Sequence, residues 1–415
     1  MSHQRPDALD VPAIRSAYPI LERTFDGTQL VYLDNAATTQ TPDPVVDAMS
    51  DYYRETNANV HRGIHHLSQE ASIAYEEAHD RLAEFVGASG GRRELVFTKN
   101  TTESENMIAH AWGLRELGPG DEVVLTQMEH HASLVTWQQV AMRAGADVKY
   151  IRVDDDGRLD MDHAREVISD DTAMLSAVHV SNTLGTVNPV SELVDLAHEH
   201  DALAFIDGAQ AVPTRPVDVE AIDADFYAFS GHKMAGPTGI GCLYGKEDLL
   251  ADLDPYLYGG GMIRKVTYDE SSWGEVPWKF EAGTPPIAEA VGLAAAADYL
   301  DDIGMERVRA HEERLAAAAY DALSGIDGLT IYGPEPGPDR AGLVSFSMEN
   351  VHAHDLASIC NDHAVAIRAG DHCTQPLHDT LGVSATARAS FYVYNSVDEI
   401  DPLVEAVEDA RALFA

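Results

Sequence analysis

A lysine at the end of an apolar segment is the first residue whose position suggests chemistry. Lys233 closes the motif Ser-Gly-His-Lys, which begins at Ser230, the last residue of the apolar segment Asp225–Ser230. A lysine amine at the end of a strand can act as a Schiff-base nucleophile once its surroundings lower its pKa. Taken alone, the motif also fits a surface lysine in a glycine-containing turn.

A carboxylate ends another apolar segment 26 residues upstream. Asp207 closes Ala202–Asp207 and precedes Gly-Ala-Gln, which ends at Gln210. A carboxylate in this place can pair with a pyridinium nitrogen and keep it protonated, which makes pyridoxal phosphate an effective electron sink. An Asp at a strand end is also a common cap or turn residue. The presence of Asp207 and Lys233 on nearby strand ends, in this order, favours the cofactor.

A possible phosphate site lies where the strand Glu94–Thr98 meets the helical segment Thr102–Leu117. The hydroxyl groups of Thr101 and Thr102, with the free N–H groups of the helix N-terminus, can hold an anion. Alternatively, Thr101 or Thr102 is the N-cap of the helix, followed by acidic residues in its first turn. Both interpretations can hold at once.

The segment 367–376 combines a thiol with two basic side chains. Glycine, aspartate and proline predict a loop here, and Arg368 and His372 lie close to Cys373. Nearby cations favour the reactive thiolate, so Cys373 is a candidate nucleophile. Cys242 lies in an apolar strand and Cys360 on a helix, where we expect small buried hydrophobic residues. Three scattered cysteines predict neither a disulfide framework nor a zinc site.

Histidines gather at two places. His130 and His131 follow the strand Glu122–Thr126, and a stacking or proton-relay imidazole at His130 is expected there. His61, His65 and His66 lack the Glu partner of the HExxH pattern, so we predict no metal site.

Short apolar segments alternate with helical periodicity in the first 290 residues. The expected strands are Glu94–Thr98, Glu122–Thr126, Asp147–Val153, Ala173–Val180, Ala202–Asp207, Asp225–Ser230 and Gly239–Tyr244, with helices at Ser68–Val86, Thr102–Leu117 and Leu134–Ala144 among them. Strands alternating with helices predict a largely parallel sheet, whose ligands bind at the carboxyl ends of the strands.

The pattern changes after residue 286. Helices are expected at Ile287–Leu300, Met305–Leu323, His354–His363 and from Val397, and strands at Gly342–Ser347 and near Val365 and Ala387. We predict an N-terminal segment (1–25) that packs with the small domain, a large α/β domain (26–290) and a small α+β domain (291–415) that carries the nucleophile loop.

Composition places limits on the function. The 415 residues are 45% apolar, which excludes a disordered, collagen-like or disulfide-stapled chain. A net charge of −41 makes nucleic acid an unexpected partner. Only six residues are lysine, and this with the acidity suggests a salt-rich cytoplasm, although an ordinary acidic enzyme is the alternative. No apolar run is long enough for a membrane span and no signal peptide is visible, so a cytoplasmic location is expected.

Together these segments resemble the pyridoxal-phosphate-dependent cysteine desulfurases of the SufS type, in the class V aminotransferase group. The resemblance rests on the motifs Tyr32–Thr39, His61–His65, Glu129–Ser133, His179–Asn182, Asp207–Gln210, Ser230–Lys233, Glu281–Pro285 and Arg388–Ser390. It implies a homodimer of fold type I, with a mainly parallel seven-stranded sheet flanked by helices and a smaller α+β C-terminal domain.

The resemblance also implies roles for individual residues. Lys233 would bind pyridoxal 5'-phosphate covalently and shuttle protons, Asp207 would pair with its pyridine nitrogen, and His130 would stack on its ring. The remaining expected cofactor contacts are Asn182 and Gln210 on the phenolate side, and Thr101, Thr102, Ser230, His232 and the partner subunit's Thr284 at the phosphate. Arg388 would clamp the substrate carboxylate, with Asn182, Arg368 and His65 as further substrate contacts.

The implied reaction converts L-cysteine into L-alanine. Cys373 would take the sulfur as a persulfide and pass it to an acceptor or scaffold protein for iron–sulfur cluster assembly. The sequence departs from the family at Lys99-Asn100, where Arg-Gly is common, and at Ala369 and Asp371, where Thr and His are common. Asp371 opposes thiolate formation, whereas Arg368 and salt favour it. Selenocysteine lyase, cysteine-sulfinate desulfinase and a catalytically silent sulfur-assembly scaffold are the alternatives.

Overall fold

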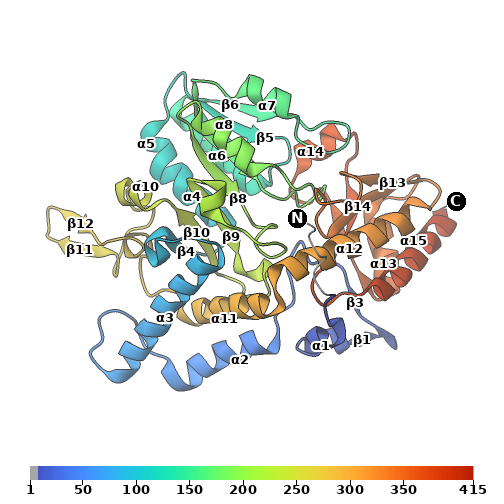
Figure 1. Ribbon diagram of the computed structural model, residues 1–415, viewed down its shortest axis with the longest axis horizontal. Helices are drawn as coiled ribbons and strands as arrows, with labels where there is room; N and C mark the ends of the chain where they lie inside the picture. Colours follow the sequence, from blue (N-terminus) through green and yellow to red (C-terminus); the bar gives the residue numbers. More distant parts are fainter. Residues whose placement is uncertain (1–7, 415) are drawn as a thin grey trace, which may run out of the picture.

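The structure, a computed structural model, describes residues 8–414 and is built around a seven-stranded sheet (Figure 1). Its strands are β4 (Leu95–Thr98), β5 (Glu122–Thr126), β6 (Asp147–Ile151), β7 (Thr172–Val178), β8 (Leu203–Asp207), β9 (Phe226–Ser230) and β10 (Gly241–Gly245). In the order β4-β10-β9-β8-β7-β5-β6, the pairs from β9 to β6 are parallel, and β10 is antiparallel to both its neighbours. The predicted, mainly parallel seven-stranded sheet is confirmed.

Both faces of this sheet are buried. Along β9, Phe226 and Ala228 point into one hydrophobic core, whereas Tyr227 and Phe229 point into another. The alternation follows from the two-residue period of a strand, and burial on both faces explains why these strands are apolar throughout. Helices α3 (His66–Phe85), α8 (Val190–His198) and α11 (Ile287–Ile303) contribute to the core that contains Tyr227 and Phe229, whereas α4 (Thr101–Ile108) and α6 (His131–Ala144) contribute to the core that contains Phe226 and Ala228.

A second, antiparallel sheet follows later in the chain. It has the order β13-β14-β17-β16 and consists of β13 (Leu329–Tyr332), β14 (Leu343–Met348), β16 (Arg368–Gly370) and β17 (Thr386–Ser390). Its core includes side chains of α12 (Met305–Ser324), α13 (Ala353–Asp362) and α15 (Ile400–Phe414). The early strand β3 (Val31–Tyr32) pairs in parallel with β15 (Val365–Ala366), so Val31 and Leu33 belong to this core as well.

The predicted domain limits stay predictions. Helix α11 runs across residue 290 and packs on α3 and α2 (Asp43–Asp51). Residues 1–7 of the predicted N-terminal segment lie outside the described residues. Within that segment, α1 (Val11–Arg15) ends on Arg15, which forms an ion pair of 2.8 Å with Glu399 beside α15.

The remaining α-helices and strands are shorter. They are β1 (Thr24–Phe25), β2 (Thr28–Gln29), α5 (Leu114–Glu116), α7 (Met161–Val167), α9 (Val219–Ile222), α10 (Glu247–Asp252), β11 (Ile263–Val266), β12 (Ser271–Trp273) and α14 (Gln375–Thr380). The β11–β12 hairpin projects from the body on the side away from the small sheet (Figure 1). Among residues 8–414, no helix is both long and apolar enough to cross a bilayer.

The net charge of −41 predicts a stability that depends on salt. Repulsion among surface carboxylates opposes the compact state, and salt shortens the screening length from about 10 Å at 0.1 M to about 3 Å at 1 M. We therefore expect the melting temperature to rise when KCl is raised from 0.1 M to 3 M, as followed by circular dichroism. A melting temperature that stays constant or falls would show that the acidic surface is not a salt adaptation.

Candidate active site

A cavity of about 300 Å³ lies at the carboxyl ends of the parallel strands, between the large sheet and the small one. Among its lining residues are Thr101, Thr102, His130, Asn182, Asp207, Gln210, Ser230, His232, Lys233, Arg368, Cys373 and Arg388. These residues come from segments almost 290 positions apart. Tertiary structure thus gathers most of the predicted site residues in one place, at the predicted edge of the sheet.

Asp207 and Lys233 form the electrostatic centre of the cavity. Asp207 ends β8, is buried, and accepts a hydrogen bond of 2.8 Å from the N–H of Ala209. Burial raises the pKa of Asp207, and the charge of Lys233 partly reverses this shift. Burial likewise lowers the pKa of Lys233 to about 8, and Asp207 opposes the shift. Each group therefore stabilises the charged form of the other.

His130 reaches the cavity from the start of α6. It is the N-cap of this helix, and its Nδ1 accepts a hydrogen bond of 3.0 Å from the N–H of Ala132. Burial lowers the pKa of His130 to about 3, with a smaller effect from the charge of Lys233. The imidazole is therefore neutral near pH 7 and carries its proton on Nε2, so its flat face can contact an aromatic ring.

The start of α4 forms one end of the cavity. Ser230 Oγ accepts a hydrogen bond of 3.0 Å from the N–H of Thr101 and lies 2.9 Å from Thr101 Oγ1, which joins the end of β9 to α4. The predicted N-cap at Thr101 or Thr102 is wrong, because Asn100 Oδ1 accepts from the N–H of Glu103 at 3.0 Å. Asn100 supplies the cap side chain, and Thr102 is exposed at the helix start, where an anion can bind.

Two arginines of the small sheet line the cavity, and an aspartate outside the cavity wall binds them. Arg388 is buried on β17, and its Nη1 donates to the carbonyl oxygen of Asn182 at 2.7 Å. Arg368 forms a bidentate ion pair with Asp34, with distances of 3.0 Å from Nε and 2.8 Å from Nη2. Arg388 Nη2 lies 3.6 Å from the same carboxylate. Arg388 Nε is buried without a partner among the described residues, so this arginine retains a donor for a ligand.

Cys373 lies beside these arginines in the loop between β16 and α14. Its N–H donates to Asp371 Oδ1 at 3.1 Å, and Asn182 Nδ2 donates to the carbonyl oxygen of His372 at 2.7 Å. In the sequence, Asp371 is only a negative charge that opposes thiolate formation. In the structure, its carboxylate also holds the loop backbone at Cys373. Of the chain's three cysteines, all within the described residues, Cys373 is exposed and Cys242 and Cys360 are buried, as predicted.

Two predicted contacts lie elsewhere. His65 is exposed, and its Nδ1 accepts a hydrogen bond of 3.2 Å from the N–H of Ser68 at the start of α3. Thr284 is exposed in the loop before α11. Neither residue is part of the cavity wall within this chain.

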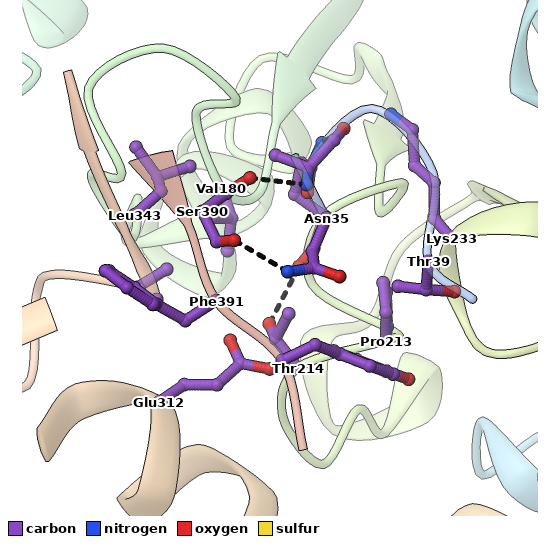
Figure 2. A pocket seen from close by; sticks show the side chains of 15 residues that line it. Asn35, Thr39, Val180, Pro213, Thr214, Lys233, Glu312, Leu343, Ser390 and Phe391 are labelled. Atoms are coloured by element: carbon purple, nitrogen blue, oxygen red, sulfur yellow. Dashed lines mark hydrogen bonds between the residues drawn. The ribbon is translucent and has the colours of Figure 1, made fainter. Parts of the chain in front are cut away.

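Lys233 and Glu312 also line a smaller cavity of about 20 Å³, and the two side chains lie on opposite sides of the view in Figure 2. Along its wall, Asn35 Nδ2 donates to the carbonyl oxygen of Ser390 at 2.7 Å, and Gln210 Nε2 donates to that of Ala36 at 2.6 Å. These bonds connect the segment after β3 both to β17 and to the segment after β8. They set where β17 carries Arg388 relative to Asp207.

Sequence reasoning missed the acidic residues that support this site. Glu129 Oε1 accepts from Thr126 Oγ1 at 2.7 Å and from the N–H of Val178 at 2.9 Å, and burial raises its pKa to about 8. Glu105 accepts from Ser133 Oγ at 2.6 Å. Glu105 thus holds the start of α6, and Glu129, the residue before His130, fixes the segment that leads into this helix against β5 and β7. The sequence signal was weak, because neither carboxylate differs locally from an exposed one.

The cavity has a suitable group for each part of pyridoxal phosphate. Asp207 is a buried carboxylate for the pyridine nitrogen, Lys233 is an amine for the aldehyde, and the start of α4 is an anion site. Asn182 Oδ1 is buried without a partner among the described residues, and it lies in the cavity wall. The residues therefore fit this cofactor. The described residues contain no group of three or more potential ligands arranged for a metal ion.

Comparisons with known proteins agree with this chemistry. Residues 31–403 match the family model for class-V aminotransferases. The chain is 68% identical to a cysteine desulfurase of Haloferax volcanii over the full length of both proteins. It is 40% identical to the apo structure of a cysteine desulfurase from Thermococcus onnurineus (TM-score 0.92; 97% of this chain and 98% of that one). It is 37% identical to a cysteine desulfurase structure from Escherichia coli (TM-score 0.91; 99% and 100%).

The family match covers most of the chain, and the curated relative covers all of it. Family and cavity both indicate pyridoxal phosphate as the cofactor. The chain belongs to the class-V aminotransferase family and, within it, to the pyridoxal-phosphate-dependent cysteine desulfurases.

Proposed function

We propose that this enzyme converts L-cysteine into L-alanine, takes the sulfur onto Cys373 as a persulfide, and delivers it to an acceptor protein for iron–sulfur cluster assembly. One observation carries the proposal: the exposed thiol of Cys373 lines the same cavity as Lys233 and Arg388. A substrate held by its carboxylate at Arg388 and by its amine near Lys233 would bring its side chain toward the loop of Cys373.

The two arginines orient the substrate. Burial lowers the pKa of Arg388 to about 10, so its guanidinium remains charged near pH 7. A guanidinium presents parallel N–H groups that match a carboxylate, and the unpartnered Nε of Arg388 leaves part of this fork free. Asp34 neutralises part of the charge of Arg368, which leaves Arg388 as the main carboxylate ligand.

Lys233 moves protons at the substrate carbon atoms. Its pKa of about 8 lets the amine accept and release a proton close to neutral pH. Bound pyridoxal phosphate supplies an electron sink that stabilises negative charge on the substrate carbon. Asp207 maintains the protonated pyridine nitrogen through its carboxylate, and His130 holds the ring in place with its neutral imidazole.

Cys373 carries out the sulfur transfer. Its sulfur attacks the sulfur of the bound cysteine, so an S–S bond forms while the C–S bond of the substrate breaks. The electron pair of the broken bond stays with the substrate carbon, which takes up a proton to give alanine. The persulfide remains on Cys373, and because this residue is exposed, an acceptor thiol can reach it.

A homodimer accounts for the two predicted residues that lie outside the cavity. Thr284 and His65 are exposed within one chain, and large apolar side chains are exposed near them in sequence, including Ile64, with 93% of its surface accessible, and Tyr268 on the β11–β12 hairpin. Exposed apolar groups of this kind are typical of interaction surfaces. We expect Thr284 of the partner subunit to complete the phosphate site.

The lowered pKa of Lys233 predicts how cofactor attachment varies with pH. An amine is nucleophilic only when uncharged, and Lys233 loses its proton near pH 8 instead of near 10.5. We expect the rate of covalent attachment of pyridoxal phosphate to the cofactor-free protein to rise up to about pH 8 and then level off. Absorbance and mass spectrometry after borohydride reduction measure it. Lys233→Ala should gain no mass, and a rate that rises steadily to pH 10.5 would contradict the assignment.

Replacement of the nucleophile tests the proposed reaction. We expect Cys373→Ala to bind the cofactor normally but to release alanine from L-cysteine at least about 100-fold more slowly, measured in molar KCl, because the sulfur has no acceptor. Cys360→Ala, which alters a buried cysteine remote from the cavity, is the matched control and should keep its activity. Wild-type alanine release by Cys373→Ala would overturn the nucleophile assignment. Activity of this variant on L-selenocysteine or L-cysteine sulfinate would identify the alternative substrates.

A further inference from the structure

A second histidine holds the nucleophile loop from outside the cavity. His131 follows His130 and is the first residue of α6. Its backbone N–H donates to the carbonyl oxygen of Cys373 at 2.8 Å. Its imidazole Nε2 accepts from the N–H of Gln375 at 3.1 Å. One residue therefore binds the loop backbone at Cys373 itself and two residues beyond it.

We propose that His131 is a positioning residue that sets how far the Cys373 sulfur reaches into the cavity. The proposal rests on the function proposed above, in which Cys373 receives the substrate sulfur. His131 is not part of the cavity wall, so its imidazole would act on the reaction through its contact to the loop, and cofactor absorbance reports any effect that passes through the neighbouring His130.

The backbone of this loop needs external support. His372 and Cys373 have φ angles of +49° and +59°, a left-handed conformation that costs energy for residues other than glycine. On the N-terminal side, Asn182 Nδ2 contacts the carbonyl oxygen of His372 at 2.7 Å. Farther along, Thr183 Oγ1 lies 2.8 Å from Thr374 Oγ1. These two contacts tie the loop to the segment that follows β7.

The C-terminal side depends on α6. Gln375 is the first residue of α14, and the first N–H groups of a helix have no acceptor within the helix. His131 Nε2 provides that acceptor for Gln375, and α6 has an unused N–H at His131 for the carbonyl oxygen of Cys373. The start of α6 thus provides a side-chain acceptor for the first N–H of α14 and a backbone donor for the carbonyl oxygen of Cys373.

Two adjacent residues therefore contact the cofactor site and the loop of the nucleophile. His130 presents its imidazole to the cavity, and the next peptide unit begins the contact to Cys373. Because both residues lie at the start of α6, this helix links the ring site to the loop of Cys373, in addition to the contacts from Asn182 and Thr183. A change at the His131 imidazole should disturb sulfur transfer and leave cofactor binding intact.

Two variants of similar size isolate the imidazole contact. His131→Gln retains an acceptor that can reach the Gln375 N–H, whereas His131→Leu fills similar space without one; the backbone contact to Cys373 survives in both. For the Leu variant of the holoenzyme we expect about tenfold faster hydrogen exchange at Gln375 and several-fold faster alkylation of Cys373 by iodoacetamide. For L-cysteine we expect a kcat about tenfold lower at an unchanged KM and cofactor absorbance. The Gln variant should recover most of each property.

The controls separate this proposal from the one on which it rests. Cys242 and Cys360 are buried, so alkylation reports Cys373, and Cys373→Ala supplies the blank. A Leu variant equal to wild type in exchange, alkylation and kcat would overturn the role of His131. Loss of cofactor absorbance in that variant would also overturn it, because His131 would then support the cofactor site. If Cys373→Ala keeps full activity, the nucleophile assignment fails, while exchange at Gln375 still reports the loop contact.

Discussion

The electrostatic coupling between Asp207 and Lys233 is the interaction on which the rest of the site depends. Burial disfavours the charge of both groups, and each offsets part of that cost for the other. A carboxylate and an amine with shifted pKa values in one cavity are what the cofactor chemistry needs. The parallel strands β8 and β9 bring them together because both strands end at the same edge of the sheet.

The substrate and sulfur chemistry depends on the contact between the two sheets. Arg388 and Arg368 belong to the small sheet, whereas Asn182 follows β7 of the large sheet. Hydrogen bonds from Asn182 to the His372 backbone, and from Arg388 to the Asn182 backbone, cross this boundary within the cavity wall. In the segment after β3, Asp34 forms an ion pair with Arg368, and Asn35 donates a hydrogen bond to β17. The residues proposed to hold the substrate are thus fixed against those proposed to hold the cofactor.

The cavity wall carries several positive charges, although the chain as a whole is strongly acidic. The chain carries 69 acidic and 28 basic residues, yet the cavity wall holds two arginines and the reactive lysine. These cations suit the phosphate group of pyridoxal phosphate and a carboxylate ligand. A buried cationic site in an acidic protein also retains its field in salt, since buried charges are screened less than exposed ones.

The sequence by itself determined the elements and the types of chemical group. Apolar strands such as Glu122–Thr126 were placed within a residue or two of their bounds, because burial on both sheet faces leaves a continuous apolar signal. The positions of Lys233 and Asp207 at nearby strand ends, and of Cys373 in a loop with basic neighbours, together predict these residues, although each position alone is common. The predicted roles of these residues and the domain limits remain predictions.

Only the tertiary structure decided which side chains meet. The pairing of Asp34 with Arg368 joins residues 334 positions apart, and the His131 contacts join α6 to the Cys373 loop. Glu129 and Glu105 resemble exposed carboxylates in the sequence, and burial alone makes them supports of the site. Asn100, not a threonine, caps α4, because the backbone conformation at the helix start selects the cap. Local sequence sets the period and polarity of each element, whereas long-range packing sets burial and therefore pKa values and partners.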